Sequence, residues 1–109
     1  MKLKVKETEI LGSICQYLQV KHYFFWRSNN IPVFDTNRKA FRAMPKWCVK
    51  GVPDIFVLTT TKTIGLEVKS KTGIVSPDQK LFEAFWNSRL ANREYHVVRS
   101  VEEVQEIGL

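Results

Sequence analysis

The stretch KGVPDIFVLTTTKTIGLEVKSKTG, residues 50 to 73, decides the fold of this chain. Two apolar runs flank the turn residues TTKT, and runs of Ile, Val, Leu and Phe bounded by turn residues are typical of strands. The first run, residues 54 to 59, is apolar on both faces, which predicts a central strand covered on both sides. The second run, residues 64 to 70, predicts a neighbouring strand with one packed face and one polar face.

Carboxylates stand at the start of the first strand and inside the second. Asp54 begins DIFVLT, whereas Glu67 and Lys69 share one face of IGLEVKS, opposite Leu66 and Val68. If the two strands are hydrogen-bonded neighbours, side chains on one face lie about 5 Å apart, close enough for both carboxylates to share a divalent ion. The alternative is a half-exposed strand whose charges are solvated.

Paired carboxylates of this kind suit a magnesium site. Mg²⁺ prefers oxygen ligands at about 2.1 Å and is usually held by one or two carboxylates together with substrate phosphate oxygens. Lys69, on the same face as Glu67, would orient a water or stabilise charge that develops on the phosphate. Neither Pro-Asp nor Glu-x-Lys is specific alone, so the prediction of phosphodiester hydrolysis depends on their joint arrangement.

A second Pro-Asp, Pro77 and Asp78, has a structural explanation. The stretch SPDQKLFEAFWNSRL, residues 76 to 90, predicts a helix with Ser76 as N-cap, Pro77 at the first position and Gln79 completing a capping box. The helix dipole favours Asp78 in the first turn, so this acid needs no catalytic role.

Periodicity predicts the remaining elements. Residues 6 to 20 carry an apolar stripe at helical spacing, and residues 23 to 28 and 95 to 100 read as strands. Ser100 caps a short last helix through Gln105. The predicted order is helix, strand, a long irregular or hairpin segment, strand, strand, helix, strand and helix.

Composition indicates one soluble domain with an anionic partner. The 109 residues show no repeats, linkers or membrane-length apolar run, and no signal peptide is expected. The formal charge of +6 favours a polyanion, although excess lysine can also serve solubility alone. Cys15 and Cys48 lack metal-ligand spacing, so reduced thiols in a cytoplasm are expected.

In chain order, the motifs resemble the virus-type replication-repair nuclease (VRR-NUC) domain of the PD-(D/E)xK nuclease superfamily. The resemblance covers nearly the whole chain and rests on ETEILGSICQYL, FFWRSNN, KGVPDI, LEVKSKTG and SPDQKLFEAF. It implies a restriction-endonuclease-like α/β fold, with a mixed sheet flanked by helices and a basic flap or hairpin after the first strand. The stand-alone size is similar to phage versions, which would act in the cytoplasm of the bacterial host.

The resemblance also implies a function. It predicts a Mg²⁺- or Mn²⁺-dependent DNA endonuclease, selective for branched DNA such as four-way (Holliday) junctions or flaps and acting as a homodimer. The alternative is a non-catalytic basic DNA-binding module on the same fold. Asp54, Glu67 and Lys69 argue against that alternative, because binding alone does not require adjacent acids that face a polyanion.

Carried over by position, the resemblance assigns roles to individual residues. Asp54, Glu67 and Val68 are assigned to the metal, and Lys69 is the lysine of the motif. Gln79 corresponds to an active-site glutamine, and helix capping and active-site support remain equally open for it.

The acid on the first helix is Glu7 or Glu9. At about 100° per residue Glu7 falls on the apolar stripe, whereas Glu9 points nearly opposite. Since an acid on a packed face needs a charge partner or a cation, Glu7 is predicted to face the acidic cluster, with a solvated helix-start acid as the alternative.

The segment from residue 30 to residue 50 is basic and aromatic. Twenty structureless residues would be unusual in a compact domain, so a partly ordered hairpin or flap that covers DNA is expected. Alternatively, Phe41 and Trp47 pack in the core beneath a solvated loop. The predicted DNA-binding residues, which combine phosphate-neutralising cations with a base-stacking aromatic, are Arg38, Lys39, Arg42, Lys46, Trp47, Lys50 and Lys71.

Overall fold

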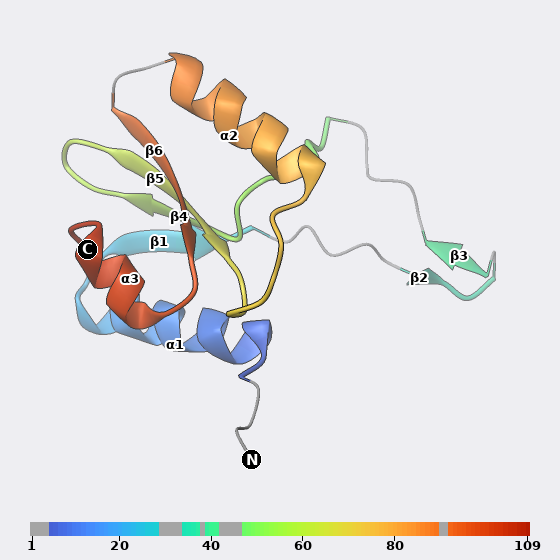
Figure 1. Ribbon diagram of the computed structural model, residues 1–109, viewed down its shortest axis with the longest axis horizontal. Coiled ribbons are helices and arrows are strands. Elements are labelled where there is room, and N and C mark those ends of the chain that lie inside the picture. Colours follow the sequence, from blue (N-terminus) through green and yellow to red (C-terminus); the bar gives the residue numbers. More distant parts are fainter. Residues whose placement is uncertain (1–4, 29–33, 38, 42–46, 90–91) are drawn as a thin grey trace.

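The computed structural model describes residues 5–28, 34–37, 39–41, 47–89 and 92–109. In chain order its elements are α1 (Glu7–Val20), β1 (Phe24–Arg27), β2 (Phe34–Asp35), β3 (Ala40–Phe41), β4 (Ile55–Leu58), β5 (Thr63–Val68), α2 (Pro77–Arg89), β6 (Arg93–Val98) and α3 (Val101–Glu106) (Figure 1). This order confirms the predicted mixed α/β architecture, including a hairpin between the first strand and the central strands.

Four strands form the main sheet in the order β1-β4-β5-β6. β1, β4 and β5 are antiparallel neighbours, and the β4–β5 register pairs Ile55 with Leu66. β6 lies parallel to β5 because α2 forms the crossover between them. β4 is therefore central, as predicted for residues 54 to 59, and β5 is its hydrogen-bonded neighbour.

One face of the sheet packs against α1 and α3, which lie side by side below it in Figure 1. α1 follows the predicted amphipathic pattern, with Ile14 and Leu18 buried. Ser100 caps α3 as predicted by accepting a hydrogen bond from the Glu103 N–H at 3.1 Å. The buried core on this face is almost entirely aliphatic and consists of Ile14, Leu18, Ile55, Val57, Ile64, Leu66, Val68, Val98, Val104 and Leu109.

The opposite face is aromatic and only partly covered. α2 packs against β6 and brings Phe82 to within 6.1 Å of Tyr95 and Trp86 to within 5.7 Å of Phe56, measured between ring centroids. The prediction that β4 is covered on both sides is wrong, since Leu58 remains 38% exposed. Because α2 lies over β6, it leaves the β1 side of this face open.

A second, small sheet consists of the β2–β3 hairpin, with Phe34 paired to Phe41 and Asp35 to Ala40. It lies apart from the main sheet (Figure 1). Within the described part of the chain, no helix has the length and apolar character needed to cross a membrane.

Candidate active site

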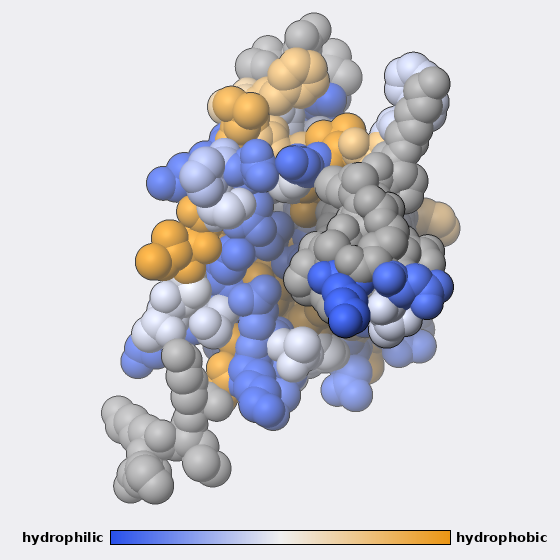
Figure 2. Space-filling view, turned by 90° about the vertical axis from the view of Figure 1, so that its right-hand side faces the viewer, coloured by the Kyte–Doolittle hydropathy of each residue, from blue (hydrophilic) through white to orange (hydrophobic). Residues whose placement is uncertain are grey.

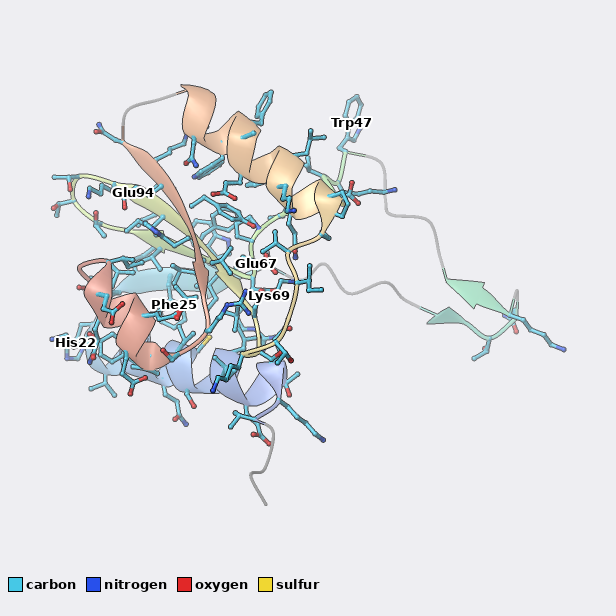
Figure 3. The ribbon with its side chains drawn as sticks, in the orientation of Figure 1. His22, Phe25, Trp47, Glu67, Lys69 and Glu94 are labelled. Carbon is cyan, nitrogen blue, oxygen red and sulfur yellow. The ribbon has the colours of Figure 1, made fainter. Side chains whose placement is uncertain are left out.

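The β4–β5 register brings the two predicted acids together. Asp54 and Glu67 each stand one residue beyond the Ile55–Leu66 pair, and Asp54 Oδ2 accepts a hydrogen bond from the Val68 N–H at 2.8 Å. Glu67 is only 2% exposed, so the alternative of a strand with solvated charges is wrong. Figure 3 shows Glu67 and Lys69 side by side near the end of β5.

Gln79 has both of the proposed contacts. Its Oε1 accepts from the Ser76 N–H at 2.8 Å, while Ser76 Oγ accepts from the Gln79 N–H at 3.2 Å, which completes the predicted capping box. The Gln79 Nε2 donates to Glu67 Oε1 at 2.6 Å. One side chain therefore both caps α2 and holds the buried Glu67 carboxylate, so helix capping is confirmed and active-site support stays a prediction that this contact favours.

Lys69 gives the acidic pair a nearby positive charge. Its Nζ lies 3.7 Å from Glu67 Oε1, and its side chain is only 12% exposed. The backbone N–H of Lys69 donates to the Val98 carbonyl oxygen at 3.0 Å, which holds this residue beside the end of β6. Lys69 is thus held beside the carboxylates and partly shielded from water.

Burial and a neighbouring negative charge raise the pKa of Glu67. Burial, followed by the neighbouring Asp54 carboxylate and hydrogen bonding to it, raises the pKa of Glu67 to about 8, and the opposing Lys69 charge only partly offsets this. Within the described residues, Glu67 Oε2 is buried and receives no hydrogen bond. A shared proton or a bound cation can satisfy this pair of carboxylates.

The donor set fits a small, hard cation. Among the residues that the structure describes, no three His, Cys, Asp or Glu side chains form a metal cluster. A metal here would rest on Asp54 and Glu67, with the predicted contribution of Val68, and would complete its coordination with water and phosphate oxygens. Such a mixed set is typical of Mg²⁺ rather than of zinc.

Two glycines, Gly51 in the loop before β4 and Gly65 in β5, let the loop that carries Asp54 pack closely against its neighbours. Gly51 has φ +79°, and a Cβ on it would lie 2.3 Å from the backbone oxygen of Asp78. A Cβ on Gly65 would lie 2.8 Å from Cγ of the buried Pro53. The GVPD turn is therefore held between the start of α2 and the middle of β5.

Ser28 adds a third anchor to the same loop. The Ser28 N–H donates to the Asp54 carbonyl oxygen at 2.9 Å, and its hydroxyl donates to the Pro53 carbonyl oxygen. Ser28 directly follows β1, so the antiparallel β1–β4 pairing continues past the strand ends to the site. Ser28 belongs to the sequence motif FFWRSNN, residues 24 to 30.

Arg99 was not predicted as a site residue, although it organises the neighbouring loop. Its Nη1 donates to the carbonyl oxygens of Ser70 and, at 2.9 Å, Gly73. This loop connects Lys69 to the cap of α2. A lone arginine near the end of a predicted strand gives no sequence signal for such a role, because the carbonyls that it binds are defined only by the folded loop.

Tyr95 was also missed. It is 5% exposed, its hydroxyl has no hydrogen-bond partner among the described residues, and burial together with the carboxylates of Glu67, Glu83 and Asp54 raises its pKa. It pairs with Gly65 across the parallel strands and so lies on the face that carries Glu67. The pattern YHVVRS predicted a strand over residues 95 to 100, two residues later than the observed β6, and did not show which face Tyr95 occupies.

Glu7 and Glu9 lie on different sides of α1, as predicted, but Glu7 is not buried. Glu7 is exposed at the start of α1, and its charge contributes to the raised pKa of Glu67, so it lies within electrostatic reach of the acidic pair. The expected packed position is wrong because the first turn of α1 precedes the helix's first buried residue, Ile14. Glu9 instead lines a separate groove.

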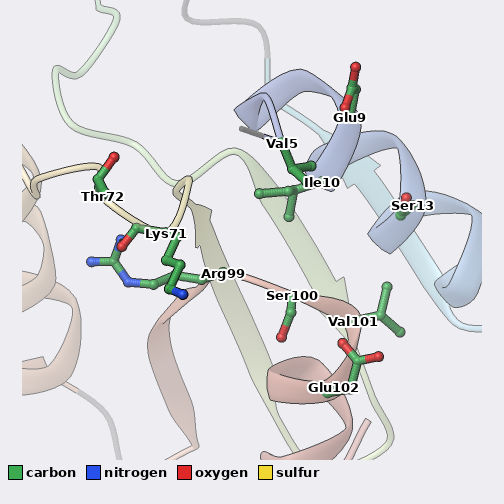
Figure 4. A pocket seen from close by; sticks show the side chains of 10 residues that line it. All are labelled: Val5, Glu9, Ile10, Ser13, Lys71, Thr72, Arg99, Ser100, Val101 and Glu102. Atoms are coloured by element: carbon green, nitrogen blue, oxygen red, sulfur yellow. The ribbon is translucent and has the colours of Figure 1, made fainter. Parts of the chain in front are cut away.

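That groove lies between α1, the loop after β5 and the start of α3 (Figure 4). Its volume is about 830 Å³, and Val5, Ile10 and Val101 form its apolar part. Lys71 and Arg99 give it positive charge on the side of the β5–α2 loop (Figure 4).

The predicted DNA-binding residues are described only in part. Lys39, Lys50 and Lys71 are exposed. Trp47 is 88% exposed, so the alternative of a core position for it is wrong. Arg38, Arg42 and Lys46, together with the side chain of Phe41, lie outside the described residues. Hydrophilic residues run down the middle of the face in Figure 2, which is the side of the molecule from which the β2–β3 hairpin projects.

Comparisons with known proteins give no relative. No model of a known protein family matches the chain, and neither the curated proteins nor the solved structures contain a match. Function must therefore be argued from the geometry of the site.

Proposed function

We propose that this protein is a Mg²⁺- or Mn²⁺-dependent DNA endonuclease with a restriction-endonuclease-like fold, similar to the VRR-NUC domains of the PD-(D/E)xK superfamily. The observation that carries the proposal is the buried Glu67, held opposite Asp54 and contacted by Gln79 at 2.6 Å and Lys69 at 3.7 Å. Burying two carboxylates together is costly unless a cation compensates them. A purely structural strand has no need of this arrangement.

Each residue has a distinct part in the proposed reaction. Asp54, Glu67 and Val68 hold the metal, which when bound supplies Lewis-acid polarisation of the phosphate. Gln79 keeps the Glu67 carboxylate in one orientation through its amide hydrogen bond. Lys69 stabilises charge on the phosphate or orients the attacking water, and Glu7 at the rim adds negative charge that favours the cation.

DNA is the proposed substrate because the chain is basic outside its acidic site. The charge of +6, together with exposed Lys39, Lys50 and Lys71, provides sequence-independent attraction to phosphates. Branched DNA and a homodimer are part of the proposal, since a two-fold dimer would present equivalent sites to the strands of a four-way junction.

The test is cleavage of a panel of single-stranded, flap, forked and four-way junction DNAs by purified protein, with and without Mg²⁺. We expect metal-dependent cleavage that falls on the order of a thousandfold in Asp54→Asn and Glu67→Gln, because several kcal/mol of transition-state stabilisation are lost. DNA binding should persist or strengthen, since each change removes a negative charge that faces phosphate.

Two results would count against the proposal. If wild-type protein binds the panel tightly but cleaves none of it with either metal, the protein is a DNA-binding module. If both variants cleave like wild type, the metal site is elsewhere. Light scattering with and without junction DNA tests the dimer, and a monomer mass in both conditions at micromolar concentration contradicts it.

A further inference from the structure

Two aromatic side chains are exposed on the same sheet face as the candidate active site. Phe24 is 68% exposed and Trp26 is 44% exposed, and both belong to the edge strand β1. They lie beyond the part of the face that α2 covers, next to Leu58. We call Phe24 and Trp26 the aromatic shelf. Exposed apolar groups gathered in one place are typical of binding surfaces.

The shelf is rigid. The Trp26 ring stacks on Phe56 with centroids 5.4 Å apart and an interplanar angle of 28°, and the Phe24 ring meets Trp26 edge-on at 6.2 Å and 74°. The backbone pairs Phe24 with Leu58 and Trp26 with Phe56. Two flat rings held in place by strand pairing and ring contacts lose little conformational entropy when another ring stacks on them.

The shelf lies close to the acidic pair. Trp26 on β1 pairs with Phe56 on β4. Phe56 follows Asp54 by two residues, so both side chains lie on the same face of the sheet. Two strand residues span about 7 Å, and stacked nucleotides are about 3.4 Å apart, so the shelf begins within a few nucleotides of a phosphate bound at Asp54 and Glu67.

We infer that the aromatic shelf stacks on unpaired nucleobases beside the scissile phosphate, so that this site selects DNA with unpaired bases next to the cut. The inference rests on the proposed nuclease function and gives it a substrate class. Aromatic rings bind bases of any sequence by stacking, but only when the base faces are not already covered in a duplex.

A nucleobase fits the shelf better than a second copy of the chain. A stable protein interface covers about 800 Å² on each partner, far more than the exposed parts of two aromatic side chains and one leucine. The neighbouring carboxylates also bind a cation in the proposed function, and a cation recruits phosphate. A strand whose phosphate lies at the acids brings its own bases to the shelf.

The experiment measures binding with Ca²⁺ in place of Mg²⁺, so that a hard cation occupies the acids and binding is recorded before any product forms. Affinities for a labelled single strand and for the matching duplex are compared between wild type, Phe24→Ala and the double variant Phe24→Leu/Trp26→Leu. Stacking on one base predicts single-strand binding that is about 5- to 100-fold weaker in the double variant, with less than about 2-fold change for the duplex. The salt dependence should not change, because no phosphate contact is removed.

The matched control is Phe85→Leu, which removes a ring that is 60% exposed on α2 and should leave both affinities unchanged. Phe24→Ala guards against a misfolded double variant, since its side chain is mostly exposed. Scanning 2-aminopurine through the single strand adds a second readout, with fluorescence quenching expected at one or two positions in wild type and lost in the double variant.

Equal losses for single strand and duplex, or no loss in either, would overturn the inference. So would a double variant that changes from dimer to monomer by light scattering while its ratio of single-strand to duplex affinity stays that of wild type, because the shelf would then join two copies. A protein that never cleaves DNA but keeps the shelf-dependent preference would refute the nuclease and leave the stacking surface intact.

Discussion

The two faces of the sheet are built from different residues and are closed to different extents. The face toward α1 and α3 is aliphatic and sealed, with Val57, Leu66 and Val68 fully buried. The face toward α2 carries aromatic rings, a buried carboxylate and an open edge at β1. The comparison indicates that one face supplies the stability that allows the other to bury Glu67 at an energetic cost.

The largest expected effect is the pH dependence of stability without metal. Because the folded-state pKa of Glu67 is about 8 against an ordinary value of 4.5, the folded protein binds the proton more tightly than the unfolded chain. The stability from this group is fully present below pH 4.5 and declines as pH rises toward 8, with an upper limit of about 5 kcal/mol.

Glu67→Gln should flatten that decline, and chemical denaturation in EDTA at pH 5, 6, 7 and 8 measures it. Adding Mg²⁺ at pH 8 should restore stability to wild type but not to the variant, because a ligand that binds only the folded state stabilises it. Glu9→Gln, which changes an exposed acid of the separate groove, should keep the wild-type slope. If the stability of Glu67→Gln fell with pH as steeply as that of wild type, the Glu67 carboxylate would not be the group whose ionisation destabilises the fold.

A pair of leucines tests the contrast between the faces directly. Leu66 is 0% exposed on the sealed face, and Leu58 is 38% exposed on the open face. Leu66→Ala should lower the free energy of unfolding by about 2–5 kcal/mol, since it removes buried methyl groups and leaves a cavity. Leu58→Ala should lose less than about 1 kcal/mol, because less apolar area leaves water when this residue folds.

Urea denaturation of the two variants at one pH provides the measurement. Equal losses would show that something covers the open face in solution, such as a second subunit. In that case the loss in Leu58→Ala should also depend on protein concentration, because the folded state of a dimer is favoured by mass action.

Much of this contrast was predictable from sequence, and the exceptions have a common cause. The alternation of Leu66, Glu67 and Val68 assigned each to its face, and SPDQ predicted the cap that Ser76 and Gln79 form. These are local patterns, and local patterns fix which way a side chain points. They do not fix what lies opposite it.

The missed features depend on distant segments. Coverage of β4 depends on where α2 crosses the sheet, and the exposure of Glu7 depends on how far α1 extends beyond its packed residues. The Arg99 contacts involve carbonyls up to 29 residues earlier in the chain. No spacing within one segment carries that information, so the sequence predicted that Asp54 and Glu67 lie together but not which residues orient the loops around them.

The next effect concerns the loop that holds Asp54. Gly51→Ala should destabilise the protein by more than about 1 kcal/mol, because a Cβ would sit 2.3 Å from the Asp78 backbone oxygen and φ is +79°. Gly12→Ala is the control: with nothing within 4 Å of its Cβ position in α1, it should stabilise by about 0.5–1 kcal/mol. Thermal melting of both variants separates the outcomes, and a neutral Gly51→Ala would show that the loop is not clamped against α2.

The smallest effect distinguishes the two Pro-Asp sequences. Asp54 is half-buried and accepts the Val68 N–H, whereas Asp78 is exposed in the first turn of α2, where the helix dipole accounts for it. Asp78→Asn should therefore lose only about 0.3–0.5 kcal/mol and keep full cleavage of any DNA that wild type cleaves. Asp54→Asn should lose cleavage while remaining folded. Melting curves and a cleavage time course on the two proteins side by side test this, and a folded Asp78→Asn protein without activity beside an active Asp54→Asn protein would transfer the metal site from the start of β4 to the start of α2.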